Sequence, residues 1–94
     1  RIECAGEVFS MEMCFITFRS VTYAQRGERV LAEEGIRARL QRTPRWMEEQ
    51  GCGYCLTLSP RQVHRAVALL RRNNVPMRRI YCRGQSGELE EMTL

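Results

Sequence analysis

Two cysteines three positions apart, Cys52 and Cys55, are the residues of this 94-residue chain best suited to chemistry. They lie in the segment TPRWMEEQGCGYCLTL, residues 43–58, where a glycine flanks Cys52 on each side. A cysteine reacts as its thiolate, and a free thiol with a pKa of about 8.5 is mostly protonated at neutral pH. Nearby positive charge favours the ionised form, and Arg42 and Arg45 enter this segment. The small flanking residues leave the sulfur and the backbone amides accessible, so we predict a reactive thiol at Cys52.

Other interpretations of a C-x-x-C pair compete with this one. A thioredoxin-like pair begins a helix, whereas this pair runs into LTL, which is typical of a strand. A copper chaperone carries its cysteines after the first strand, where this chain has RSVTY. A closed zinc site needs about four ligands and would have to recruit His64, which falls in the middle of a predicted helix, and Cys82. Two small apolar side chains in a glycine-rich turn remain a further alternative.

The remaining cysteines carry weaker signals. Cys14 and Cys82 fall in predicted strands, where a buried cysteine behaves as a small hydrophobic residue. Strand alternation sends Cys55 to the open face of the sheet, away from its apolar neighbours and from Cys52. Five cysteines without regular spacing, and no secretory leader, argue against a secreted disulfide framework. We therefore expect a reducing cytoplasm as the setting.

The charge of the chain is uneven. All 15 basic residues are arginine, and all 11 acidic residues are glutamate, which gives a net charge of +4. The ends are acidic, so residues 11–83 carry 14 arginines against 6 glutamates, a balance of +8. Guanidinium groups bind phosphate, carboxylate or sulfur oxyanions through paired donors, although uniform arginine use is equally consistent with nucleotide composition of the gene. No apolar run approaches the roughly 18 residues of a membrane span.

The hydrophobic pattern predicts four strands and two helices. The strands are expected at 13–18, 36–43, 53–58 and 77–82, and the helices at 20–34 and 59–74. Ser20 is a typical N-cap and Gly35 a typical C-terminal left-handed residue, while Ser59-Pro60 is a strong helix start.

The order βαββαβ predicts a ferredoxin-like α+β sandwich with a four-stranded antiparallel sheet and both helices on one face. The first and third strands would be central, with the second beside the third. The loop that contains Cys52 would then join neighbouring strands. We expect this domain over residues 12–83, after an N-terminal appendage at 1–11 and before a loose acidic tail at 84–94.

Several short motifs resemble a family of small bacterial proteins described as selenium/sulfur carrier-like. They are TFRSVT after the first strand, AEEGI-A-L at the end of the first helix, TPR before the loop, and Cys-Gly at the third strand. The resemblance runs from about residue 14 to 82. It implies that Cys52-Gly53 is the family's Cys-Gly, and that TPR is its companion turn. At the position of Cys55 the family usually has a small apolar residue.

The residues and the resemblance together predict a carrier more than a true enzyme, with no cofactor and no metal. Cys52 would take sulfur or selenium from a donor such as a cysteine desulfurase, hold it as a persulfide or selenium analogue, and pass it to an acceptor protein. Cys55 would release it by forming a disulfide. The predicted binding residues are Thr43, Pro44, Arg45, Gly51 and Gly53.

A non-enzymatic binding module is the alternative. RNA is an unlikely ligand, because strand 53–58 lacks the aromatic-rich signature of RNA-binding sheets. A small-ligand or protein-binding domain would use the open face of the sheet, with Cys55 and Phe15 at a possible homodimer interface.

Overall fold

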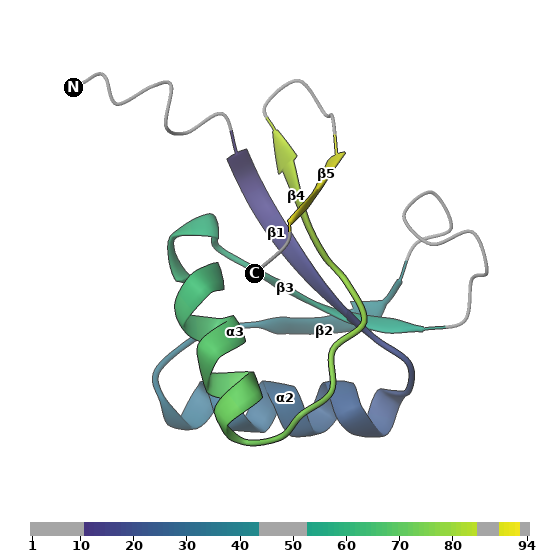
Figure 1. Ribbon diagram of the computed structural model, residues 1–94, viewed down its shortest axis with the longest axis vertical. Helices are drawn as coiled ribbons and strands as arrows, with labels where there is room; N and C mark the ends of the chain where they lie inside the picture. The colour runs from purple at the N-terminus through teal and green to yellow at the C-terminus, as the bar shows by residue number, and fades with distance from the viewer. Residues whose placement is uncertain (1–10, 44–52, 85–88, 93–94) are drawn as a thin grey trace.

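The computed structural model describes residues 11–43, 53–84 and 89–92, which form one α+β unit (Figure 1). Its elements are β1 (Met11–Phe18), α2 (Val21–Glu33), β2 (Arg39–Arg42), β3 (Tyr54–Leu58), the 3₁₀ turn η1 (Pro60–Gln62), α3 (Val63–Arg72), β4 (Ile80–Gly84) and β5 (Leu89–Met92). Within these ranges no helix has the length and apolar character needed to cross a membrane.

The sheet is antiparallel throughout, with the strand order β2-β3-β1-β4-β5. The predicted neighbours are confirmed, since β1 and β3 are central and β2 lies beside β3. The predicted number of four strands is wrong, because residues 89–92 of the expected loose tail form a fifth strand on the outer side of β4. Paired backbone groups and an ion pair between Arg79 and Glu91 at 3.8 Å stabilise this edge.

Local signals set the ends of α2 as predicted. The Ser20 hydroxyl accepts a hydrogen bond from the backbone N–H of Tyr23, which satisfies one of the first free donors of the helix. At the other end Gly35 adopts a φ of +80°, and its N–H donates to the carbonyl of Ala32. The chain therefore leaves the helix in a tight turn, and Ile36 enters the core.

The second helical segment begins with η1, where the Ser59 hydroxyl accepts from the N–H of Arg61. It continues as α3 and ends at Asn73, followed by Asn74 in the left-handed region at φ 59°. The predicted serine start and asparagine end are thus confirmed. The last predicted strand begins later than expected, at Ile80 and not at residue 77.

Side chains alternate between two faces of the sheet, and both helices cover the same one. The main core joins Ile16, Phe18 and Leu56 of the sheet to Leu31 of α2 and Leu70 of α3. A second, smaller cluster lies on the opposite face, which no described helix covers. It consists of Phe15, Cys55 and Tyr81, with Met13 packed against them.

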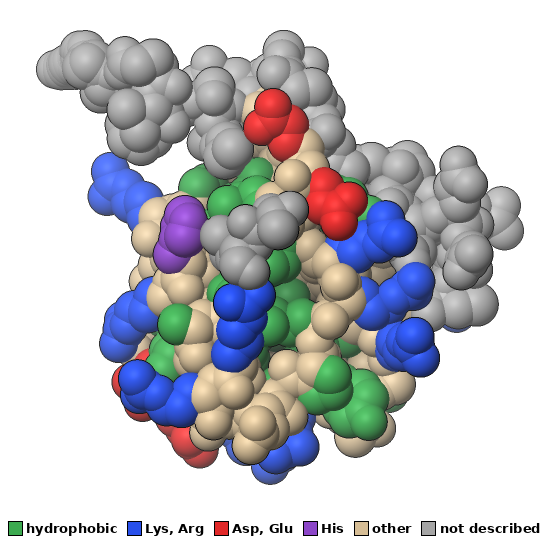
Figure 2. All heavy atoms as spheres, in the orientation of Figure 1, with side chains coloured by type: hydrophobic (Ala, Val, Ile, Leu, Met, Phe, Trp, Pro, Cys, Tyr) green, Lys and Arg blue, Asp and Glu red, His purple; other side chains and the backbone are tan. Residues whose placement is uncertain are grey.

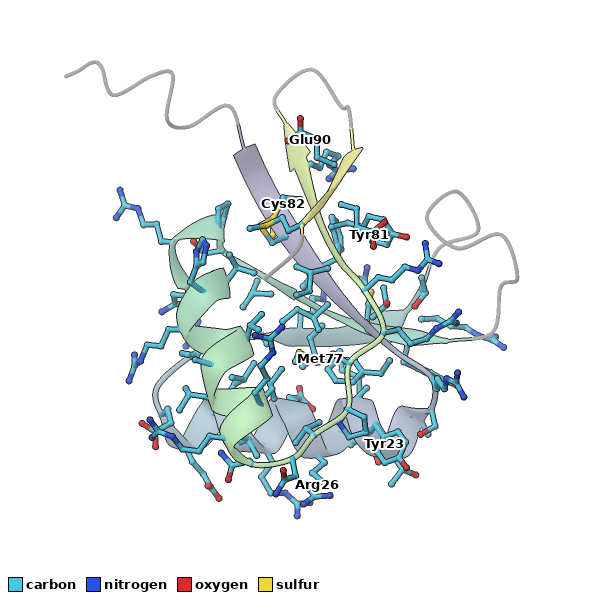
Figure 3. The ribbon with its side chains drawn as sticks, in the orientation of Figure 1. Tyr23, Arg26, Met77, Tyr81, Cys82 and Glu90 are labelled. Carbon is cyan, nitrogen blue, oxygen red and sulfur yellow. A yellow bond between two sulfur atoms is a disulfide. The ribbon has the colours of Figure 1, made fainter. Side chains whose placement is uncertain are left out.

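A disulfide joins Cys14 of β1 to Cys82 of β4 beneath the helices. The two residues are direct cross-strand partners with a Cα–Cα distance of 4.0 Å, and both are almost fully buried. Figure 3 shows the bond, with Cys82 and Tyr81 pointing to opposite sides of β4. The predicted structural role of these cysteines therefore needs a correction, because they are a covalent pair and not two separate apolar side chains. Met92 of β5 packs on this pair, with its Sδ 3.0 Å from Cys82 Sγ.

The disulfide closes a long loop, because its cysteines are 68 positions apart. Replacing both by alanine should lower the free energy of unfolding by about 4 kcal/mol, since the cross-link restricts the unfolded chain. Denaturant unfolding followed by circular dichroism measures this loss.

Cys55→Ala is the matched control, because Cys55 is an equally buried but unpaired cysteine. It should cost only about 1 kcal/mol through lost packing. A double variant that loses no more than twice the control would contradict a stabilising cross-link.

Candidate functional site

The structure describes three of the residues predicted for the site: Thr43, Gly53 and Cys55. Cys52 lies outside the described residues, together with Pro44, Arg45 and Gly51. The predicted site can therefore be examined at the two ends of its loop and at the third strand.

The two ends of the loop meet at the end of the sheet. The backbone N–H of Thr43 donates to the carbonyl of Gly53 at 3.0 Å, which extends the β2–β3 ladder by one pair beyond Arg42 and Tyr54. Cys52 therefore precedes a residue that the sheet holds directly. The prediction that this loop joins neighbouring strands is confirmed.

Gly53 is packed against the end of β1. A Cβ at this position would lie 2.9 Å from the carbonyl oxygen of Phe18 and 3.5 Å from the Thr43 hydroxyl. The first of these atoms belongs to the backbone, so it cannot turn aside as a flexible side chain can. The glycine after Cys52 thus has a steric role at the start of β3, in addition to the accessibility predicted for it.

Cys55 lies on the open face, as its position in the strand predicts. It pairs directly with Gln41 of β2 and Thr17 of β1, and its side chain is fully buried.

Burial raises the pKa of the Cys55 thiol, because the thiolate loses hydration. Hydrogen bonding from the side chains of Gln41, Thr43 and Thr57 opposes this effect but does not overcome it. The hydroxyls of Thr43 and Thr57 have no well-formed hydrogen bond, so their support for a charged sulfur is weak. Cys55 is therefore a protonated, sheltered thiol at neutral pH.

The aromatic side chains of the open face are also covered. Phe15 is 4% exposed and Tyr81 is 9% exposed, and the guanidinium carbon of Arg83 lies 5.8 Å from the centre of the Phe15 ring. Base stacking needs an exposed ring, and this part of the sheet presents none among the residues described. The same burial means that Phe15 and Cys55 are already covered within a single chain.

The alternative zinc ligands are not brought together. His64 is exposed on α3, whereas Cys82 is consumed by the disulfide. Over the described ranges, no three side chains of His, Cys, Asp or Glu are grouped as a metal site would require.

The sequence of residues 13–82 matches the family described as "Putative Se/S carrier protein-like". The chain belongs to this family. The resemblance predicted from the sequence motifs is confirmed, and the family supports a general role in carrying selenium or sulfur. Among curated proteins and among solved structures, none matches this chain significantly.

Within this carrier-like domain, sequence reasoning missed the polar surroundings of Cys55. Gln41 is the direct partner of Cys55 on β2, and Thr57 lies two residues further along β3. Alternation predicts the face of each residue, and the β2–β3 register was the additional information needed to bring them together.

Gly53→Ala should destabilise the carrier-like domain by about 1–3 kcal/mol, because the new methyl group meets a backbone carbonyl. Gly27→Ala is the matched comparison. Its Cβ would meet only side-chain ends of Leu70, Leu56 and Phe18 at 3.2–3.3 Å, and alanine favours the helix. Thermal unfolding of both variants tests the contrast, and an equal or smaller loss in Gly53→Ala would contradict it.

The raised pKa of Cys55 predicts a stability that falls in alkali. Above the unfolded pKa of about 8.5 the unfolded thiol releases its proton while the buried one keeps it, so stability is lost as pH rises toward the folded pKa. The slope contributed by Cys55 is at most about 1.4 kcal/mol per pH unit.

Urea unfolding of the wild type and of Cys55→Ser between pH 7.5 and 9.5 measures this contribution as a difference. The serine variant should lose less stability over that interval. Parallel curves for the two proteins would show that the folded state does not raise this pKa.

Proposed function

We propose that the protein carries sulfur or selenium on Cys52, as a persulfide or its selenium analogue, between a donor enzyme and an acceptor. The observation that carries the proposal is the junction of Thr43, Gly53 and Phe18, which holds the residue after Cys52 at the end of the sheet. In a family described as carrier-like, the cysteine next to this sterically constrained glycine is the best candidate for the residue that carries sulfur or selenium.

The proposed loading step is a thiolate exchange. The Cys52 thiolate attacks the terminal sulfur of a donor persulfide, a new Cys52 S–S bond forms, the donor S–S bond breaks, and the donor thiolate leaves. The electron count is unchanged, so the step needs no oxidant or metal. An acceptor thiolate can remove the terminal sulfur by the same exchange.

Positive charge near the loop supports the ionised forms on which this exchange depends. Arg42 is exposed at the last position of β2, directly before Thr43. Arg45 follows in sequence, and we propose that both guanidinium groups stabilise the Cys52 thiolate and the terminal anionic atom. Thr43, Pro44 and Gly51 would shape the loop around them.

Cys55 has a slower part in this scheme. Its thiolate would attack Cys52 Sγ and form a Cys52–Cys55 disulfide, while the bond from Cys52 Sγ to the terminal sulfur or selenium breaks and that atom takes a proton from water to leave as hydrosulfide or its selenium analogue. Because burial raises the pKa of Cys55, little thiolate is present at neutral pH. We therefore expect transfer to an external acceptor to be the faster route, and release through Cys55 to gain importance in alkali.

We propose a reducing cytoplasm as the setting, because Cys52 must remain a free thiol to accept sulfur. The Cys14–Cys82 disulfide would then persist through its burial, which keeps soluble reductants from its sulfur atoms. A cysteine desulfurase is the expected class of donor. We also assign the elements from β1 to β4 to the ferredoxin-like sandwich, with β5 as an addition at its edge.

Mass spectrometry of the intact protein tests the carrier proposal. After incubation with a cysteine desulfurase and cysteine, or with a small persulfide donor, wild type should gain about 32 daltons for each sulfur held. Cys55→Ser should gain the same mass, and Cys52→Ser should not.

Cys55→Ser is the matched control, since it removes one thiol of the same C-x-x-C pair and leaves Cys52 in place. A full adduct on Cys52→Ser, or an adduct lost in Cys55→Ser alone, would show that another residue than Cys52 carries the sulfur. Absence of an adduct with both donors would reject the carrier proposal.

A further inference from the structure

The end of β1 brings two arginines close to the base of the Cys52 loop. Arg19 directly follows Phe18, whose carbonyl oxygen packs on Gly53. On the other side of β1, the backbone N–H of Arg78 donates to the carbonyl of Thr17 at 2.7 Å. Arg19, Arg78 and the residue after Cys52 therefore share one end of the central strand.

A shallow surface hollow lies at this end of the sheet. Its volume is about 60 Å³, and it is lined by Arg19, Tyr23, Pro76, Met77 and Arg78, which we call the Tyr23 patch. Tyr23 is 39% exposed and is the exposed large hydrophobic residue of the described surface. Figure 3 shows it projecting outward from α2, and Figure 2 shows hydrophobic side chains at the surface there with arginines beside them.

Among the described residues around the Tyr23 patch, arginines outnumber carboxylates. The described lining of its hollow contains no carboxylate. Arg26 lies one turn further along α2 and donates to the carbonyl of Asn73 at 3.4 Å. Next to the patch, a hollow of about 310 Å³ is lined partly by Arg71, Arg78 and Arg79, and Glu91 is the one carboxylate in the part of its lining that the structure describes.

We infer that the Tyr23 patch is the surface on which the sulfur or selenium donor enzyme docks. This inference rests on the proposed function of Cys52. Tyrosine and arginine are enriched in the energetically important parts of protein interfaces, where the ring provides the anchor and guanidinium groups pair with carboxylates. The donor is therefore a protein that presents acidic side chains around an apolar one.

A protein fits these observations better than a small oxyanion does. The hollow is too small and open to enclose a ligand. The exposed Tyr23 ring provides apolar contact area, which suits a protein surface better than it suits an oxyanion that needs hydrogen-bond donors. Complementary charge between proteins acts mainly on the rate of encounter and weakens with added salt.

The test compares two double variants of equal charge change. Arg19→Glu/Arg78→Glu alters the patch. Arg37→Glu/Arg61→Glu is the control, because both residues are exposed and lie far from the Cys52 loop. Arg37 precedes the start of β2 at Arg39, and Arg61 follows the end of β3 at Leu58, whereas the loop joins the other ends of these two strands. For each protein, the rate of Cys52 loading by a cysteine desulfurase is divided by the rate with a small persulfide donor.

At low salt this ratio should fall about tenfold in the patch variant and by much less in the control, as expected for steered association. Tyr23→Ala should lower the ratio too, without changing its dependence on salt. An equal fall in both double variants would show that the loading ratio depends on net charge alone, and it would contradict the proposed docking surface. So would a wild type loaded no faster by the enzyme than by the small donor, although that result leaves the carrier proposal intact. Loss of loading with both donors would instead reject the carrier proposal itself.

Discussion

The burial of both faces of β1 is the constraint on which the rest of this structure depends. Five consecutive residues of the strand, Cys14 to Phe18, are buried, and alternate ones point into the helix-covered core and into the smaller cluster opposite. Because β3 and β4 pair with its two sides, each feature of the site is set relative to it. Its last carbonyl excludes a side chain at Gly53, and its residue Thr17 receives the N–H of Arg78.

The three cysteines that the structure describes lie on opposite faces of the sheet and differ in their chemistry. Cys14 and Cys82 face the helices and are bonded to each other, whereas Cys55 faces the other side and remains a protonated thiol. Neither group competes readily for an incoming sulfur atom, since all three sulfurs are buried. A carrier that loads one defined thiol benefits from such separation, because exchange between neighbouring thiols would otherwise scatter the cargo.

Local sequence patterns predicted much of this fold. Ser20, Gly35 and Ser59 each act through hydrogen bonds within a few residues, so their roles could be recognised directly. The face of Cys55 followed from alternation alone. The Cys14–Cys82 pair required the register of two strands far apart in the chain, and β5 required a partner strand to make the charged sequence LEEM favourable. The pKa of Cys55 depends on side chains from two strands, which no single segment contains.

The Cys14–Cys82 bond turns most of the chain into a covalent ring. Its two members lie on either side of the β2–β3 connection in sequence, and they are 68 positions apart. Cleavage of any one peptide bond between them would open the ring but leave both pieces attached to each other. A nicked molecule would therefore keep its mass, apart from one added water, until a reductant reached a sulfur pair that the helices and Met92 shield from solvent.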